Sequence, residues 1–167
     1  LQAAPCFERL TVPQKVEVFQ HALDTTDGGD LAHVLWLKSA TSESWLERRT
    51  CYTRSVAVMS MVGYVLGLGD RHGENILLQR QSGSVMHVDF NYIFWVGERL
   101  HYPERVPYRL TRNIVDAMGI TGVEGSFRAV CEIVLALLRQ NSDALMSVIE
   151  GFVYDPLIDN SLKSAER

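Results

Sequence analysis

The stretch GLGDRHGENILL (67–78) sets the architecture of the chain, because a dense polar cluster in it separates an apolar helix from an apolar strand. The run before it, residues 55–69, carries no charge, which predicts a buried helix that Gly67 or Gly69 ends. Beyond it, residues 76–78 and 85–89 flank a Ser-Gly turn and predict a β-hairpin. The sequence therefore indicates a polar site between one long helix and one hairpin.

The rest of the chain is dominated by helical periodicity. Apolar residues recur at helical spacing over 13–23, 31–37 and 123–139, from Thr111 onward and again after Ser142. Ser44 and Glu47 fit a capping box for the long helix, and Pro156 is expected to stop the last one. Residues 90–108 contain two prolines and predict a loop. The expected fold class is mainly α with a small catalytic β-hairpin.

Composition excludes several functional classes. The chain has 167 residues, of which 47% are hydrophobic and 22% charged, as in one globular domain with a core. A net charge of −4 argues against a nucleic-acid module, and the uncharged run is shorter than the roughly 20 residues of a membrane helix. We therefore expect no direct nucleic-acid or membrane binding. The three cysteines share no short spacing, so an intracellular compartment is expected.

The polar cluster contains the ligands and acid–base groups of phosphoryl transfer. Asp70, Asn75 and Asp89 supply carboxylate and amide oxygens, which suit Mg²⁺ better than zinc. Taken singly, each has a structural explanation as a cap or turn residue, and His72 could be a scaffold histidine. Their spacing is more specific, because Asp-x-x-x-x-Asn is also the catalytic-loop spacing of protein kinases. The triplet here is Asp-Arg-His, the reverse of the kinase order.

Five ordered motifs carry a family resemblance. They are GLGDRHGENILL (67–78), HVDFN (87–91), PERVPYRLT (103–111), GITGVEGSFR (119–128) and FVYDPLID (152–159). Together they resemble the phosphatidylinositol 3-kinase-related protein kinases. The resemblance implies a protein-kinase-like C-terminal lobe of a PI3/PI4-kinase-like catalytic domain over 1–167. The N-terminal lobe is expected to be absent, because the sequence shows no glycine-rich phosphate loop or strand lysine.

The resemblance also implies a role for each matching residue. The implied catalytic residues are Asp70 and His72, the implied metal ligands Asn75 and Asp89, and the implied adenine contacts Leu77 and Val88. ATP and Mg²⁺, with Mn²⁺ as a substitute, are the implied cofactors. Asn91 replaces the glycine of the kinase Asp-Phe-Gly triplet, and asparagine tolerates a left-handed backbone, so activity is still expected. Alone, the chain is expected to bind Mg-ATP weakly and to transfer no phosphate.

The substrate is expected to be a protein. Between Phe90 and Tyr108, two arginines are balanced by two glutamates, and this neutral loop favours a peptide hydroxyl over an inositide head group. The resemblance implies serine or threonine followed by glutamine as the acceptor. It also implies partners: the kinase's own N-terminal lobe and helical-repeat regions, and an adaptor subunit.

The motifs look most like the ATR-type DNA-damage checkpoint kinases, which implies DNA repair signalling in the nucleus. Residues 120–125 and 152–157 are also shared with the ATM-type and nonsense-mediated-decay members, and the latter would be cytoplasmic. Two other classes remain open. One is a non-catalytic pseudokinase or scaffold lobe, against which the intact Asp70, Asn75 and Asp89 argue. The other is a metal-dependent hydrolase using His72, His87, Asp70 and Asp89, although no HExxH pair supports it.

Overall fold

The structure is a computed structural model that describes residues 9–99 and 104–153. Its helices are α1 (Val12–Thr25), α2 (Asp30–Leu37), α3 (Ser42–Leu66), α4 (Arg112–Asp116), α5 (Ser126–Gln140) and α6 (Ser142–Val153). Its strands are β1 (Ile76–Leu78) and β2 (Val85–His87), and short 3₁₀ turns occur at Gly73–Asn75, Val96–Arg99 and Gly122–Glu124. The expectation of a mainly helical fold with one small hairpin is confirmed.

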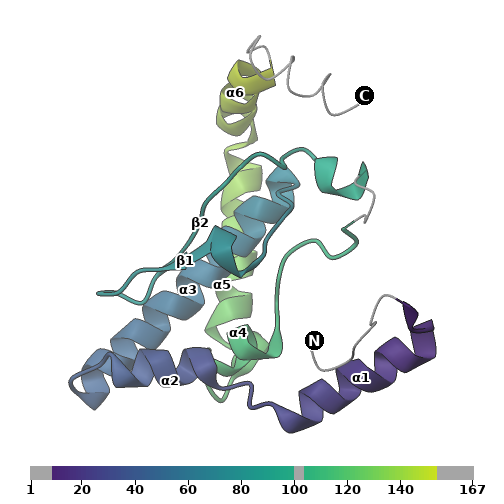
Figure 1. Cartoon of the computed structure of the whole chain (residues 1–167). Helices are drawn as coiled ribbons and strands as arrows, with labels where there is room; N and C mark the ends of the chain where they lie inside the picture. Colours follow the sequence, from purple (N-terminus) through teal and green to yellow (C-terminus); the bar gives the residue numbers. More distant parts are fainter. Residues whose placement is uncertain (1–8, 100–103, 154–167) are drawn as a thin grey trace.

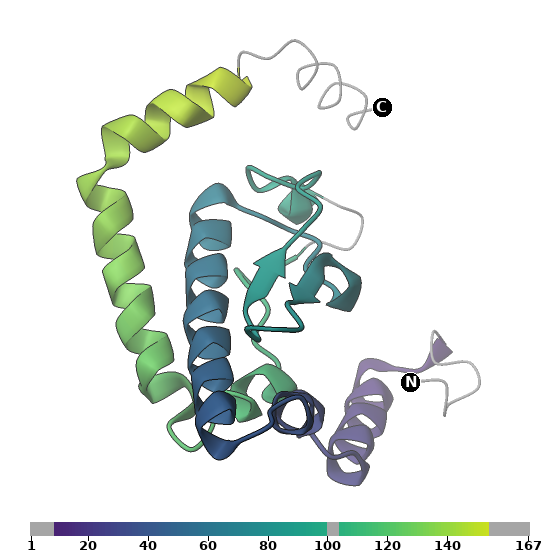
Figure 2. The same ribbon diagram turned by 90° about the vertical axis from the view of Figure 1, so that its left-hand side faces the viewer.

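Helix α3 forms the axis of the structure. Helix α5 runs along one side of it and the hairpin covers another (Figure 2). The core lies between these elements, α2 and α4, and contains Leu35, Tyr52, Val56, Ala57, Val85, Ile114, Ala117, Met118 and Phe127. The hydroxyl of Tyr52 on α3 donates a hydrogen bond to the carbonyl oxygen of Ile114 on α4 at 3.2 Å, which links the two helices across the core. Burial raises the pKa of the Tyr52 hydroxyl well above its usual range.

The two ends of α3 show how the sequence defines it. Thr41 is the N-cap: its Oγ1 accepts from the N–H of Ser44 at 3.2 Å, and Ser44 Oγ accepts from the N–H of Thr41 at 3.1 Å. The expected cap at Ser44 is therefore wrong by three residues. Gly67 ends the helix in the left-handed conformation, with φ 61°, as expected. Tyr64 and Val65 near this end are exposed, so α3 is not buried on all sides.

The hairpin places one apolar face on α3 and leaves the other open. Its register pairs Leu77 with Met86 and Leu78 with Val85. Val85 is buried, and its N–H donates to Ser55 Oγ on α3 at 2.8 Å. Leu77 and Met86 lie on the opposite face and are 49% and 58% exposed. The second strand ends at His87, two residues earlier than the sequence predicts, because the chain turns at Asp89.

Helix α1 contributes no buried residue to this core. Helix α1 lies away from the hairpin (Figure 1), and none of its residues is buried by the described parts of the chain. The apolar face predicted there is exposed, at 60% for Val16 and 56% for Phe19. The predicted stripe on α5 faces the core: Phe127 is buried, and Val130 and Cys131 are partly buried against it. No helix in the described ranges is long and apolar enough to cross a membrane. The expected stop at Pro156 lies outside the described residues.

Candidate active site

The turn that carries Asp70 begins where α3 ends. Leu68 and Gly69 are buried, and the N–H of Gly69 donates to the carbonyl oxygen of Tyr92 at 2.7 Å. The N–H groups of Phe94 and Trp95 donate to the last carbonyls of the helix, on Leu66 and Gly67, at 2.8 and 3.1 Å. These bonds satisfy helix-end carbonyls that have no partner inside the helix. The segment that follows Asp89 is thereby attached to the segment that precedes Asp70.

Asp70 is held by its main chain and partly open at its carboxylate. Its φ is 58°, a left-handed value that is uncommon for residues other than glycine. Its N–H donates to Glu104 Oε1 at 2.7 Å, and its carbonyl oxygen accepts from Asn75 Nδ2 at 2.9 Å. The side chain is 38% exposed. A carboxylate that is fixed at its base and accessible at its tip suits a group that must orient an incoming hydroxyl.

His72 faces Asp70 with one ring nitrogen. Its Nδ1 lies 3.2 Å from the main-chain nitrogen of Glu74, and its Nε2 lies 3.2 Å from Asn75 Nδ2. This Nε2 lies 3.8 Å from Asp70 Oδ2, and the side chain is 47% exposed. The ring therefore presents Nε2 beside the carboxylate. The structure brings the two predicted catalytic residues together.

The side-chain amide of Asn75 is oriented by its surroundings. Asn75 is buried, and its Nδ2 lies 2.9 Å from the carbonyl oxygen and 3.5 Å from Oδ2 of Asp70. Because both are acceptors, the nitrogen must face them, and Oδ1 points elsewhere. No described residue donates a hydrogen bond to that Oδ1. An amide oxygen free of protein partners is available to a metal ion.

Asp89 sits across the hairpin from Asn75, and the two segments are joined by the main chain. The N–H of Val88 donates to the carbonyl oxygen of Asn75 at 3.0 Å. Asp89 has φ 60° and is exposed, and its Oδ1 accepts from the N–H of Asn91 at 3.1 Å. The left-handed residue of this turn is therefore Asp89 and not Asn91, which corrects the expectation. Convergence of the Asn75 and Asp89 side-chain oxygens stays a prediction.

The chemistry of these donors fits Mg²⁺. Mg²⁺ is commonly held by one or two carboxylates and keeps several waters, so a partly exposed set is suitable. The residues that could hold it are Asn75 through Oδ1 and Asp89 through its carboxylate. Within the described ranges, no three His, Cys, Asp or Glu side chains form a metal-binding group. The residues of the hydrolase hypothesis therefore do not form a metal site within those ranges. His87 Nδ1 is buried and has no hydrogen-bond partner among the described residues.

Arg71 connects the two aspartate turns, a role that the sequence did not reveal. Its guanidinium donates to the carbonyl oxygens of Gly69 and Val88, both at 2.7 Å, and also to those of Asn75 and Asp89. Burial lowers the pKa of this guanidinium, and the negative charges of Asp70, Asp89 and Glu104 oppose that shift. In the sequence, only the position of Arg71 between Asp70 and His72 points to this role.

The open face of the hairpin could receive a nucleotide base. Leu77, a predicted adenine contact, is exposed on that face, whereas Val88 is half-buried. Met86 is paired with Leu77 and equally open, so the apolar surface is larger than the sequence analysis indicated. Alternation along the second strand was the signal that could have identified Met86.

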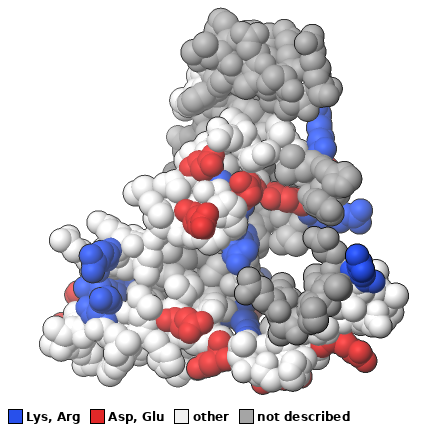
Figure 3. Space-filling view, in the orientation of Figure 1, with Lys and Arg blue, Asp and Glu red and all other residues white. Residues whose placement is uncertain are grey.

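A hollow next to Asp70 could receive a substrate. A cavity of about 500 Å³ is lined by Leu68, Asp70, Arg71, His72 and residues 104–111. On the face shown in Figure 3, acidic and basic side chains are interspersed and no broad basic area is visible.

Comparisons with known proteins give the family. The sequence profile of the phosphatidylinositol 3- and 4-kinase family matches residues 2–162. The chain is 55% identical to the serine/threonine-protein kinase mTor of Drosophila melanogaster, over 100% of this chain and 7% of that protein. It is 58% identical to the serine/threonine-protein kinase TOR of Oryza sativa subsp. japonica, over 95% of this chain and 6% of that protein. For the serine/threonine-protein kinase ATR of Drosophila melanogaster the identity is 54%, over 92% and 6%.

A solved structure agrees with the fold. The FAT and kinase domain of CtTel1 superimposes with a TM-score of 0.84 and 38% sequence identity, over 90% of this chain and 11% of that chain. The chain belongs to the phosphatidylinositol 3- and 4-kinase family. Within it, the chain is similar to part of the serine/threonine-protein kinases mTor and ATR and to part of the FAT and kinase domain of CtTel1. It spans 6–7% of the length of the curated relatives named above.

Proposed function

We propose that this chain is the catalytic lobe of a protein kinase that transfers the γ-phosphate of ATP to serine or threonine. The proposal rests on the way in which Asp70 is held. Its main chain is fixed by Glu104 and Asn75, while its carboxylate is open to the cavity of about 500 Å³. In a kinase, this group meets the hydroxyl of the substrate.

Each residue of the cluster has a step in this reaction. The hydroxyl oxygen attacks the γ-phosphorus, the bond from that phosphorus to the β–γ bridging oxygen breaks, and the hydroxyl proton passes to Asp70. Nε2 of His72 lies beside the same carboxylate, where an N–H on this atom would stabilise the charge that develops. Asn75 and Asp89 would hold Mg²⁺, which neutralises charge on the phosphates. Leu77, Met86 and Val88 would contact the adenine.

We further propose that the chain works as part of a larger kinase. The described residues show nothing that covers the phosphates of ATP, which in kinases is done by a glycine-rich loop and a strand lysine. An N-terminal lobe, helical-repeat regions and an adaptor subunit would be its partners. On its own, the chain is expected to bind Mg-ATP weakly and to leave protein substrates unphosphorylated.

Two branches of the family compete for the choice of substrate. The motifs at 67–78 and 87–91 favour a checkpoint kinase that acts in the nucleus on serine or threonine followed by glutamine. Overall identity favours the TOR kinases, at 54–58% against 54% for an ATR kinase. We propose the checkpoint assignment on the motifs alone, with a TOR-type role as the second candidate.

A peptide assay on the full-length kinase tests both the kinase assignment and the checkpoint branch. Wild type should phosphorylate a peptide with Ser-Gln, whereas Asp70→Asn should do so about 10²–10⁴-fold more slowly, because the amide cannot accept the proton. Asp143→Asn, an exposed position in the first turn of α6, is the matched control and should keep wild-type turnover. Normal turnover by Asp70→Asn would contradict the kinase assignment. Equal use of Ser-Gln and Ser-Ala peptides would contradict the checkpoint branch and leave the kinase assignment intact.

A further inference from the structure

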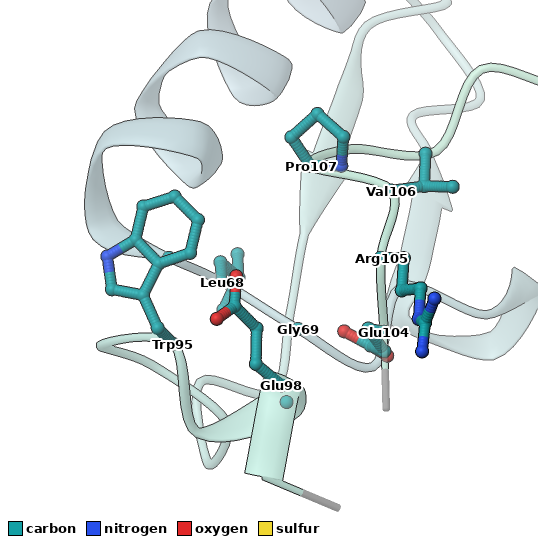
Figure 4. Close-up of a pocket in the computed structure, with 10 residues that line it drawn as sticks. Leu68, Gly69, Trp95, Glu98, Glu104, Arg105, Val106 and Pro107 are labelled. Carbon is teal, nitrogen blue, oxygen red and sulfur yellow. The ribbon is translucent and has the colours of Figure 1, made fainter. Parts of the chain in front are cut away.

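Glu104 connects a distant loop to the turn that carries Asp70. It lies 34 positions after Asp70 in the sequence, yet its Oε1 accepts the N–H of Asp70 at 2.7 Å. Its own N–H donates to the carbonyl oxygen of Gly97 at 3.1 Å. In Figure 4 the side chain of Glu104 turns toward Gly69, whereas that of Arg105 turns the other way. Glu104 therefore reaches the main chain of the Asp70 turn, and it also lines the cavity of about 500 Å³ next to Asp70.

Two glycines leave the space that this carboxylate occupies. A methyl group at Gly69 would lie 2.5 Å from Glu104 Oε2, and one at Gly97 would lie 2.7 Å from the same atom. Either distance is too short for a real contact, so any larger residue would displace the carboxylate. Glycine at both positions allows the close approach, and the packing leaves the Glu104 side chain little freedom to move.

We propose that Glu104 is a positioning residue for the transfer reaction, acting through Asp70, a role that rests on the proposed kinase function. Asp70 adopts a left-handed backbone, which is unfavourable for a residue with a side chain, so the turn needs external bonds to keep it. Glu104 supplies the acceptor for the N–H of Asp70, and Asn75 supplies the donor for its carbonyl. Glu104 thus fixes where the Asp70 carboxylate points.

A competing explanation assigns Glu104 a purely electrostatic role. Its negative charge acts on the guanidinium of Arg71, and this would help to keep Arg71 charged between the two turns. The two explanations differ in what they require of residue 104. Positioning requires an acceptor oxygen at the Oε1 site, which glutamine also provides. A charge effect requires a carboxylate, which glutamine lacks.

The first test measures kcat, the KM for ATP and the melting temperature of full-length kinase variants. Glu104→Ala should lower kcat about 10–100-fold, because small displacements of a reacting group have effects of that size, and should leave the KM for ATP almost unchanged. Glu104→Gln should recover most of the lost turnover. Glu98→Ala removes a carboxylate from the wall of the neighbouring cavity that Glu104 also lines, and should behave as wild type. Glutamine as damaging as alanine would overturn the positioning role.

A double-mutant cycle separates positioning from general loss of structure. If Glu104 acts through Asp70, Glu104→Ala should lower kcat by less than about threefold once Asp70→Asn is present, because groups that act as a unit are non-additive. A full, additive loss in the double variant would overturn the inference. Normal turnover by Asp70→Asn alone would instead overturn the proposed function. The two failures are therefore distinguishable.

Discussion

Two turns in this lobe each place an aspartate in the left-handed conformation, and they are held in different ways. In the turn at 69–75, both main-chain groups of Asp70 bond to side chains, those of Glu104 and Asn75. In the turn at 89–95, the carbonyl of Asp89 accepts from Arg71, while its carboxylate bonds to the N–H of Asn91 within the same turn. Each turn is held partly from within and partly from outside, and they differ in which group is anchored. The N–H of Asp70 bonds to the distant Glu104, whereas the carboxylate of Asp89 bonds inside its own turn.

The difference matches the two tasks proposed for the carboxylates. A base that meets a hydroxyl gains from a fixed direction, because catalysis depends on the geometry of the reacting atoms. A metal ligand at the mouth of a nucleotide site must accept an ion that enters and leaves with the nucleotide. Asp89 is exposed, and its segment is anchored a few residues later, at Phe94 and Trp95. The two turns should therefore respond differently to substitution.

The largest effect is expected for Asp70→Ala in the full-length kinase. It should lower kcat by about 10²–10⁴-fold, the usual contribution of a general base, and leave Mg-ATP affinity close to wild type. Steady-state kinetics together with nucleotide titration measure the two quantities separately. If Asp70 only stabilises its turn, the melting temperature should fall while turnover stays near normal, and that result would remove Asp70 from the catalytic residues.

A different pattern is expected for Asp89→Ala. It removes a proposed metal ligand, so Mg-ATP affinity should fall by about 10–100-fold, the scale found when metal sites are perturbed, and turnover should fall with it. Titration of the nucleotide with and without Mg²⁺ measures the effect. Without Mg²⁺ the variant and wild type should bind equally. An affinity loss that does not depend on Mg²⁺ would show that Asp89 serves the turn and not the metal.

The sequence predicted the parts of this site that are close together in the chain. Residues 67–78 identified the end of α3, the polar turn and the first strand, because each has a local signal in apolar runs, glycines and spacing. The pairing of the hairpin followed from its Ser-Gly turn. The helices were predicted for the same reason, and the cap of α3 and the start of α5 each differ from the prediction by three residues.

Long-range contacts were not predictable in this way. The bond from Asp70 to Glu104 spans 34 positions, and nothing local in PERVPYRLT marks its glutamate as an internal acceptor. The four carbonyl bonds of Arg71 depend on how the two turns meet, which only the folded chain defines. Periodicity on α1 indicated an apolar face correctly, yet it could not show that no described element covers that face.

A smaller effect, on stability, is expected at Gly67, where the end of α3 contacts Trp95. Gly67 has φ 61°, and a methyl group there would lie 2.6 Å from the main-chain nitrogen of Trp95. Gly67→Ala should therefore lower the free energy of unfolding by about 1–3 kcal/mol through backbone strain and a clash that only backbone movement relieves. Gly151→Ala on α6 is the control, since no heavy atom lies within 4 Å of its added methyl group. In thermal unfolding, Gly67→Ala should have a clearly lower melting temperature than that control.

The smallest effect is expected for Asn91→Ala, although this residue departs from the kinase Asp-Phe-Gly triplet. Asn91 is exposed and lacks the positive φ that would favour asparagine or glycine over alanine. Its contact with Asp89 Oδ1 uses the main-chain N–H, which alanine keeps. Turnover and Mg-ATP affinity should change by no more than about twofold, the kinetic equivalent of the 0.5 kcal/mol typical of neutral surface substitutions. A tenfold loss in either would mean that the Asn91 side chain acts in the site, and that the second turn does not hold Asp89 by its own main chain.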